Sequence, residues 1–270
     1  MPEGHTLFRL AADLNAVFAG QQVEVTSPQG RFSDGAATVD GQVMDLAESA
    51  GKHLFLRFES GPVIHVHLGL IGAFRIEEGD PPEPVGAVRL RIVGPSAYAD
   101  LRGAITCELV DEVKMATAID RLGPDPLRLD ADADKAFARI HASKKAIGAL
   151  LMDQTVLAGV GNVYRAESLF RARLHPLTPG GKVSRRRWDA IWADLVELMD
   201  YGVQTGRIDT VRPEHEPEAM GREARVDDHG GEVYVYRRAG QPCHVCSSVV
   251  RTRVLEGRNL FWCPTCQRRR

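Results

Sequence analysis

Four cysteines near the C-terminal end of the sequence are spaced as metal ligands. Cys243 and Cys246 form one CxxC pair, and Cys263 and Cys266 form another. Each pair can chelate through one tight turn, and four thiolates complete the closed tetrahedral shell of a structural zinc site. Redox-active CxxC motifs are the alternative, which is disfavoured because neither pair stands between a strand and a helix. We therefore predict one structural Zn²⁺ ion that takes no part in chemistry.

The segment around these cysteines is strongly basic, although the net charge of the whole chain is -2. Eight arginines and a single acid, Glu256, stand between Val235 and Arg270. Such a local excess of positive charge attracts a polyanion. Arg258 falls at or near the tip of a predicted hairpin, where a guanidinium can contact a phosphate through two hydrogen bonds. A solvated arginine without a ligand is the alternative reading.

A glycine-rich turn forms a second candidate site for phosphate. Residues 144–167 have the pattern helix, turn, helix, with Gly159 and Gly161 in the turn and Asn162 at the expected N-cap of the second helix. Backbone amides at a helix N-terminus bind phosphate well. A dinucleotide-binding fingerprint is excluded, because a helix and not a strand precedes the glycines. Spacing alone leaves both phosphate binding and a plain helical hairpin open.

The elements that must position these residues fall into a β-rich region and a helical region. A helix is predicted over residues 3–18, and since no helices alternate with the strands that follow, we expect antiparallel sheets in a two-layer sandwich. The predicted strands are Leu54–Phe58, Val63–Ile76, Val88–Val93 and Ala104–Val110. Beyond the breaker at residues 123–126, helices are predicted at 133–142, 144–153, 162–173, 184–205 and 215–222.

The predicted fold class is α+β with three domains: a β-sandwich at residues 1–122, a helical domain at 123–234 and a four-cysteine hairpin at 235–270. In the hairpin, strands Arg251–Leu255 and Leu260–Trp262 flank a loop at residues 256–259. Residues 221–231 are polar and glycine-rich and are predicted to form a loop. Neither a leader peptide nor a membrane-spanning run is apparent, so we expect a cytoplasmic protein in which the lone Cys107 is a buried thiol.

Several short motifs, in one order along the chain, resemble the formamidopyrimidine-DNA glycosylase/endonuclease VIII family, and in pattern its actinobacterial members of the endonuclease VIII type. They run from residue 2 to residue 267, so the resemblance covers essentially the whole chain. The motifs are Met1–Gly4, Gly51–Leu54, His67–Gly69, Gly123–Leu127, Leu151–Gln154, Gly159–Tyr164 with Glu167, and Phe261–Gln267. The resemblance implies that residues 154–167 form a helix-two-turn-helix motif, and that the protein is a monomeric DNA glycosylase/AP lyase of base excision repair acting on damaged DNA.

The family's chemistry gives roles to the first residues of the chain. Removal of Met1 would expose the secondary amine of Pro2; an α-amine has a pKa of roughly 7.7–8.0, and the start of a helix lowers the pKa further. Such an amine can attack C1′ of the damaged nucleotide and form a Schiff base that permits β(,δ)-elimination. The resemblance implies this role for Pro2, general acid/base catalysis for Glu3, and a place near the lesion phosphate and the amine for Lys52.

The same resemblance implies the DNA contacts. His67, Asn162 and Arg258 match phosphate ligands, and Glu167 matches an acidic residue near the active site. The alternative for His67 is that it simply belongs to a polar face of the sheet. The alternative for Glu167 is that it is an ordinary carboxylate on a helix surface. Apolar wedges usually fill the gap left by a flipped base; Leu70, and after it Ile71, stands at the position of the wedge.

Two positions bear on base specificity, and a third, Thr6, lacks the carboxylate that the family usually has there. Arg102 matches the arginine that probes the orphaned base, but Ala104 stands where the 8-oxoguanine branch has phenylalanine, and Thr6 where both branches usually have glutamate. Because of Ala104, we expect oxidised pyrimidines as substrates in preference to 8-oxoguanine. The alternative function is a protein that binds or senses damaged or abasic DNA with weak or lost catalysis.

Overall fold

The computed structural model describes residues 2–226 and 231–269, and the chain forms two compact units, Met1–Arg121 and Leu122–Arg270. The predicted third domain at residues 235–270 is not a separate unit. Its residues Cys243, Val250 and Phe261 are buried in the same apolar core as the helices of the second unit. A segment this short lacks enough apolar surface for a core of its own, so it completes that of its neighbour.

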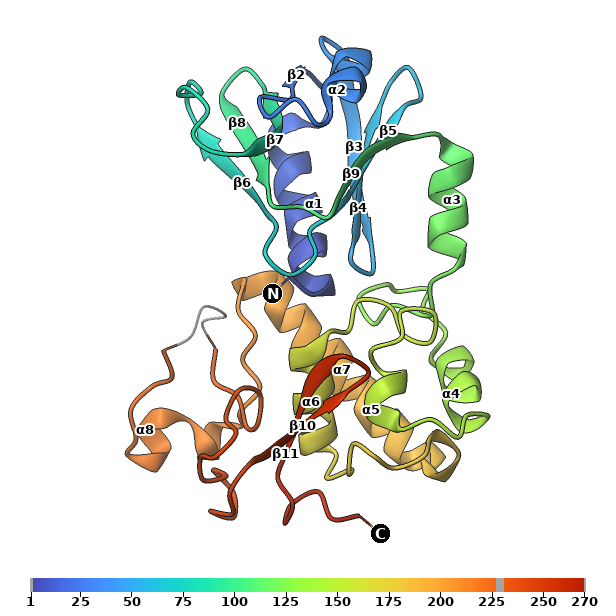
Figure 1. The fold of residues 1–270 in the computed structure, drawn as a ribbon, viewed down its shortest axis with the longest axis vertical. Helices are drawn as coiled ribbons and strands as arrows, with labels where there is room; N and C mark the ends of the chain where they lie inside the picture. Colours follow the sequence, from blue (N-terminus) through green and yellow to red (C-terminus); the bar gives the residue numbers. More distant parts are fainter. Residues whose placement is uncertain (1, 227–230, 270) are drawn as a thin grey trace. The chain divides into compact units, whose positions relative to one another are not determined.

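The first unit is a two-layer antiparallel β-sandwich with three helices. One sheet has the order β1-β3-β4-β5-β9 and the other the order β2-β7-β8-β6 (Figure 1). The elements in chain order are α1 (Gly4–Phe18), β1 (Gln21–Gln22), β2 (Glu24–Thr26), α2 (Ser33–Val39), β3 (Val43–Ala50), β4 (His53–Phe58), β5 (Val63–His67), β6 (Ala73–Glu78), β7 (Val88–Val93), β8 (Ala97–Arg102), β9 (Thr106–Val110) and α3 (Glu112–Asp120).

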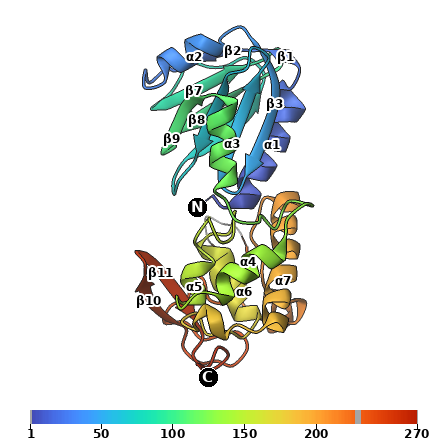
Figure 2. The same cartoon turned by 90° about the vertical axis from the view of Figure 1, so that its right-hand side faces the viewer.

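Helix α1 belongs to the core of this unit. It packs against β3, β4 and β6, and Leu7, Leu14 and Phe18 are buried on its apolar stripe. The five-stranded sheet therefore has α1 on its core side, while α3 packs against β5 on the other side (Figure 1). Helix α2 covers the end of the sandwich beside β2 (Figure 2). Cys107 is buried as predicted, and burial raises the pKa of its thiol to about 12.

The single strand predicted over Val63–Ile76 is wrong, because the structure breaks it into β5 and β6, which belong to different sheets. The connecting turn depends on glycine. Gly69 adopts a left-handed φ of +71°, and a Cβ on Gly72 would lie 2.2 Å from the carbonyl oxygen of Leu68. A side chain at Gly72 cannot be accommodated against that backbone atom, so the chain turns from one sheet to the other at this point.

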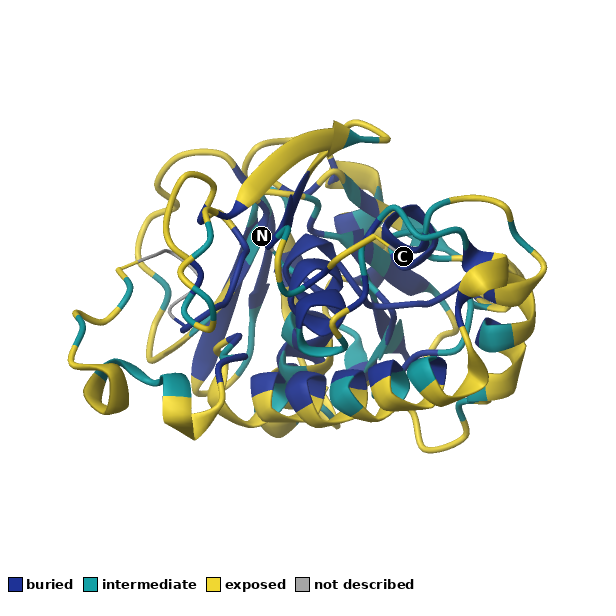
Figure 3. Ribbon diagram, turned by 90° about the horizontal axis from the view of Figure 1, so that it is seen from below, coloured by how far each residue is buried: buried dark blue, intermediate teal, exposed yellow. Residues whose placement is uncertain are grey.

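The second unit is helical and carries a β-hairpin. Helix α6 packs against α5, α7 and β11, and nine of its ten residues are buried, so it is the dark blue helix at the centre of Figure 3. The elements are α4 (Ala133–His141), α5 (Ile147–Leu150), α6 (Asn162–Arg171), η1 (Gly180–Lys182), α7 (Arg185–Thr205), η2 (Pro213–His215), α8 (Pro217–Met220), β10 (Arg251–Leu255) and β11 (Arg258–Trp262).

Two predicted helices are shorter than the periodicity suggested. The helix at 144–153 is reduced to α5, because Ala146 pairs with Pro179 in a β-bridge that holds the preceding residues extended. The helix at 215–222 is divided between η2 and α8, since Pro217 starts a new helix and cannot continue an old one. No helix in the described ranges is long and apolar enough to cross a membrane.

Candidate nucleic-acid interface and catalytic residues

Pro2 stands directly before α1 in the first unit. Glu3 is the N-cap residue, with extended backbone, and the helix begins at Gly4. The first turn of α1 contains no acidic residue, so the positive end of the helix dipole acts on the Pro2 nitrogen without a compensating charge from that turn. The Glu3 side chain beside that nitrogen is fully buried.

Lys52 and His67 belong to the edge where strands of the five-stranded sheet turn. Gly51, with φ of +57°, and Lys52 form the tight connection between β3 and β4, which places the lysine at a strand entrance. His67 is the last residue of β5 and lies opposite His53 of β4. Burial, and then the positive charge of Lys52, lower the pKa of His67. The Gly69 amide donates to His67 Nδ1 at 3.1 Å, so neutral His67 carries its hydrogen on Nε2 and can donate it to a phosphate.

The predicted wedge lies on the turn between β5 and β6. Leu70 is 48% exposed and Ile71 is 86% exposed, although both are large apolar side chains. Ile105 adds a third exposed apolar residue, packed against Gly69, where an added Cβ would lie 2.7 Å from its side chain. The sequence reading missed Ile105, although an isoleucine beside a predicted wedge loop could have been noticed once the strands were paired.

Arg102 is the last residue of β8, and its side chain is only partly engaged in contacts with the rest of the protein. It donates to Asp100 at 2.9 Å and its side chain stays 38% exposed. Asp100 itself is buried and held by Arg91 through two hydrogen bonds of 2.7 and 2.8 Å. The buried pair of Arg91 and Asp100 therefore holds the carboxylate that Arg102 contacts in a fixed position. Ala104, two residues further on, is buried and offers no side chain to a DNA base.

The structure corrects the position of Asn162. The N-cap residue of α6 is Gly161, and Asn162 is the first residue of the helix. Its side chain is buried and donates from Nδ2 to the carbonyl oxygen of Asn259 at 3.0 Å. Arg165, one turn further along, donates to the same carbonyl at 2.9 Å and also to the Asn162 side chain. Asn162 and Arg165 thus fasten the start of α6 to the zinc hairpin, a role for Arg165 that the sequence reading missed.

Glu167 is not a surface carboxylate. Its side chain is fully buried in the second unit, where it accepts hydrogen bonds from the backbone amides of Tyr234, Val235 and Tyr236 at 2.7 to 2.9 Å. The Thr210 hydroxyl donates a fourth bond at 2.8 Å. The predicted direct role at DNA does not fit this burial. Glu167 instead holds the chain that leads into the zinc hairpin.

The four cysteine sulfurs meet the predicted geometry of a zinc site. All lie within 4.8 Å of one another, with Sγ atoms 3.4 Å apart for Cys246 and Cys263 and 3.9 Å apart for Cys243 and Cys266. Tetrahedral zinc with Zn–S bonds of about 2.3 Å requires sulfur separations of about 3.8 Å. The residues fit one structural Zn²⁺ ion, and the closed shell leaves no position for substrate.

The hairpin exposes three of its arginines. Its loop is tighter than predicted, because Glu256 and Gly257 alone form the turn with φ of 46° and 73°, the positive values of a two-residue hairpin turn. Arg258 therefore begins β11 immediately after the turn, and it is exposed together with Arg251 and Arg253 of β10, the broad yellow strand in Figure 3. Arg238, by contrast, is buried and donates to the carbonyl oxygens of Tyr234 and Pro242, so it contributes little to the exposed charge.

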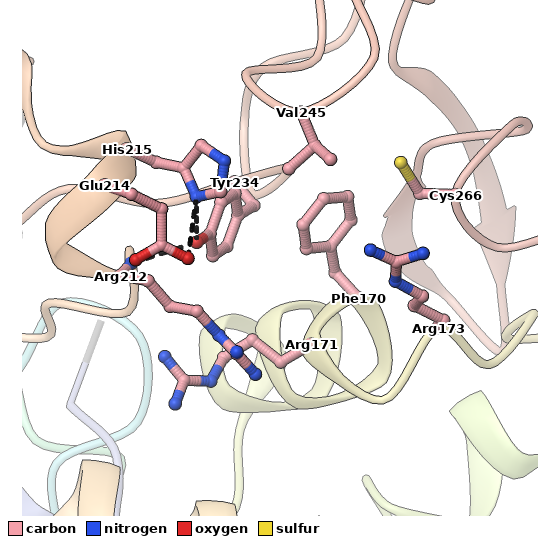
Figure 4. A pocket seen from close by; sticks show the side chains of 9 residues that line it. All are labelled: Phe170, Arg171, Arg173, Arg212, Glu214, His215, Tyr234, Val245 and Cys266. Carbon is pink, nitrogen blue, oxygen red and sulfur yellow. Dashed lines mark hydrogen bonds and ion pairs between the residues drawn. The ribbon is translucent and has the colours of Figure 1, made fainter. Parts of the chain in front are cut away.

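The second unit contains a pocket that is lined by its own residues (Figure 4). Tyr234 closes one side of it, since its hydroxyl accepts from the Arg212 amide at 2.9 Å and lies 3.0 Å from His215 Nδ1. Arg171 is engaged by Asp194 at 2.7 Å. Of the predicted site residues, the pocket includes only the zinc ligand Cys266. Its lining is Phe170, Arg171, Arg173, Arg212, Glu214, His215, Tyr234, Val245 and Cys266.

Comparison with known proteins identifies the class. The formamidopyrimidine-DNA glycosylase N-terminal domain matches residues 1–107, the formamidopyrimidine-DNA glycosylase H2TH domain residues 122–213, and the zinc finger found in FPG and IleRS residues 240–269. Together with the relatives below, these matches show that the chain belongs to the formamidopyrimidine-DNA glycosylase/endonuclease VIII family of DNA-repair glycosylases, which confirms the predicted family, fold class and zinc site.

Individual proteins and solved structures are similar to this chain over nearly its whole length. The chain is 53% identical to Endonuclease 8 1 of Mycobacterium tuberculosis over 99% of this chain and 100% of that protein. It is 31% identical to formamidopyrimidine-DNA glycosylase of Parasynechococcus marenigrum over 99% of both chains. The structure of MutM (Fpg) from Thermus thermophilus covers 98% of both chains with a TM-score of 0.77 at 26% identity. Lactococcus lactis Fpg with abasic-site DNA shares the fold with a TM-score of 0.80 at 20% identity.

Replacing Glu167 with Gln is expected to destabilise the second unit by about 3 kcal/mol, because an amide cannot accept all four hydrogen bonds and presents N–H groups to N–H donors. Urea unfolding of the two proteins measures the loss. Glu197→Gln, on an exposed position of α7, is the matched control and should unfold as the wild type does. Equal stability of the Glu167 variant and the control would contradict the role assigned to this carboxylate.

Removing zinc with a chelator is expected to abolish specific DNA binding, because the metal contributes about 10 kcal/mol or more to folding of such modules. Fluorescence anisotropy with labelled duplex DNA follows the loss, and added Zn²⁺ should restore binding. Cys263→Ala should behave like the chelated protein, whereas Cys107→Ala, which removes a cysteine outside the cluster, should bind normally. Full DNA affinity of Cys263→Ala would refute the structural role of the site.

Proposed function

We propose that this protein is a bifunctional DNA glycosylase/AP lyase that removes oxidised bases, pyrimidines in preference, from damaged DNA and then cleaves the strand. One observation carries the proposal: in a chain of this glycosylase family, Pro2 and Glu3 stand at the N-terminal end of α1, where the helix dipole favours a neutral amine. The proposed enzyme acts as a monomer on DNA.

The proposed nucleophile is the secondary amine of Pro2 after Met1 has been removed. The nitrogen attacks C1′ of the damaged nucleotide, the glycosidic bond breaks, and the base leaves with its bonding electron pair. Opening of the sugar and loss of the N–H proton then give an iminium, which acidifies the C2′ hydrogen. Loss of that proton expels the 3′ phosphate by β-elimination, and water finally releases the amine.

Glu3 and Lys52 assist this chemistry in the proposal. A carboxyl group positioned beside the reacting sugar can give and take protons there as a general acid/base. Glu3 is buried beside the nucleophile, in keeping with that role. Lys52 and His67 are proposed to hold a DNA phosphate near the lesion, one as a cation and the other as a neutral Nε2–H donor.

The preference for pyrimidines rests on the residues that would face the orphaned base. Arg102 supplies a partly exposed guanidinium anchored by Asp100, but Ala104 cannot stack beside it. Without an aromatic partner, discrimination of the opposite base is expected to be weak. Arg258, exposed beside the hairpin turn, is proposed to contact the phosphate backbone together with the N-terminal end of α6.

Borohydride trapping on abasic duplex DNA tests the nucleophile. The wild type is expected to form a covalent adduct whose mass maps to the peptide that begins with Pro2. Pro2→Gly offers a primary amine with a different geometry. The yield of its trapped adduct should be about tenfold lower than that of the wild type. Pro84→Gly, in an exposed loop of the same unit, is the control and should trap normally. An adduct that survives Pro2→Gly unchanged would contradict the role of Pro2, and no adduct in the wild type would favour the alternative of a damage-binding protein.

Leu70→Ala tests the wedge. Base flipping costs a few kcal/mol of stacking and pairing, and a lost wedge is expected to reduce excision from duplex DNA about tenfold. Excision from single-stranded DNA should be unchanged, because no gap has to be filled there. Leu129→Ala removes a leucine of the other unit that is even more exposed than Leu70, and it should alter neither rate. A parallel fall in both rates for Leu70→Ala would argue against a wedge.

A further inference from the structure

A row of aromatic rings covers one face of the five-stranded sheet, on the side away from the α1 core. His53 lies opposite His67, and Phe55 opposite His65, in the register of β4 and β5. The ring centroids of His53 and His65 are 5.1 Å apart, and those of Phe55 and His65 are 4.9 Å apart, in stacked arrangements. The rings of His53 and His67 meet edge to face at 5.1 Å. The three histidines therefore form one contiguous group.

Hydrogen bonds join two of these histidines to a carboxylate on the next strand. Glu108 of β9 lies opposite His65 and its Oε1 is 3.0 Å from His65 Nδ1. His65 Nε2 in turn lies 2.8 Å from His53 Nδ1. A carboxylate only accepts, so His65 carries hydrogen on Nδ1, and His65 Nε2 then accepts from His53 Nδ1 when both rings are neutral. That arrangement leaves the lone pair of His53 on Nε2.

Burial, and after it the charged neighbours, explain why His53 stays neutral in the free protein. Burial lowers its pKa to about 4, and the positive charge of His65, His67 and Lys52 lowers it in the same direction. Glu108 is the carboxylate bound to the pair. Two further carboxylates of the same region, Glu48 of β3 and Glu112 of α3, are engaged with Arg57 at 3.1 and 2.5 Å.

We propose that Glu108, His65 and His53 form a proton relay that makes His53 an additional ligand for a DNA phosphate when DNA binds. A proton from solvent enters at His53 Nε2, which turns that atom from an acceptor into a donor. The bridging hydrogen moves from His53 Nδ1 to His65 Nε2, so the new positive charge comes to rest beside Glu108. This inference rests on the proposed contact of Lys52 and His67 with a phosphate.

The relay couples phosphate binding to proton uptake. A phosphate beside His53 favours the protonated state, and by linkage lower pH must favour the phosphate. His67 needs no proton for its own contact, because its Nε2 already carries hydrogen. The proton taken up on binding is therefore assigned to the relay and not to His67.

Calorimetry of binding to a duplex with an uncleavable abasic-site analogue tests the proposal. Measurements at pH 6.5 in buffers of different ionisation enthalpy give the number of protons exchanged. The wild type is expected to take up a large fraction of one proton, and its affinity should rise up to about tenfold between pH 8 and pH 6. Glu108→Gln should lose most of the uptake while keeping its affinity at pH 8. Glu59→Gln, an exposed carboxylate of the same unit, should keep both.

Nitrogen NMR of the free protein gives a readout that does not depend on DNA. At neutral pH, His53 should be neutral with its hydrogen on Nδ1, bonded to His65 Nε2, and His67 should carry its hydrogen on Nε2. If Glu108→Gln fails to fold, Glu108→Asp breaks the same bond with the charge retained. Hydrogen on His53 Nε2 at neutral pH, or equal proton uptake by wild type and Glu108→Gln, would overturn the relay. Either result would leave borohydride trapping at Pro2 unaffected, whereas failed trapping with intact uptake would count against the proposed lyase alone.

Discussion

A carboxylate removed from water is stable only where hydrogen-bond donors replace its hydration, and Glu167 meets that demand with three successive backbone amides and the Thr210 hydroxyl. Because the amides belong to Tyr234–Tyr236, the same bonds hold the chain that enters the zinc hairpin against α6. Nearer the N-terminus of α6, Asn162 and Arg165 fasten the helix to the hairpin, because both bond the carbonyl oxygen of Asn259. One helix therefore orients the hairpin at two points.

Zinc would complete this arrangement by joining Cys243 and Cys246, which precede β10, to Cys263 and Cys266, which follow β11. The cluster contributes Cys243 and Cys263 to the apolar core, while β10 stays exposed. A short basic segment whose arginines repel one another gains its fixed shape from the metal, the core and the α6 contacts together. The exposed Arg258 can then meet a phosphate in a position set by these three constraints, with little conformational entropy left to lose.

The sequence predicted what depends on composition, spacing and motif: the sandwich, the helical region, the cysteine cluster and the family. It failed where tertiary contacts override local pattern. The β-bridge of Ala146 shortened a helix, and the close approach at Gly72 divided a strand. Likewise, nothing in the residue type shows that Glu167 is buried, since a helical glutamate is ordinarily solvated. The ring-to-ring pairing of His53 and His65 required the strand register, which the alternating pattern leaves unspecified.

Two carboxylates show how the surroundings, and not the residue type, determine a role. Glu167 is surrounded by donors that are all fixed in the backbone or in a buried hydroxyl, so its bonds resist exchange and serve the fold. Glu108 is more than half exposed and bonds a single imidazole, whose hydrogen can move. A hydrogen bond to a titratable ring adds a second state to the site, because the proton can rest on either ring of the pair. For that reason the sheet face of the first unit, and not the better packed α6, is the part of the molecule whose charge can respond to a bound phosphate.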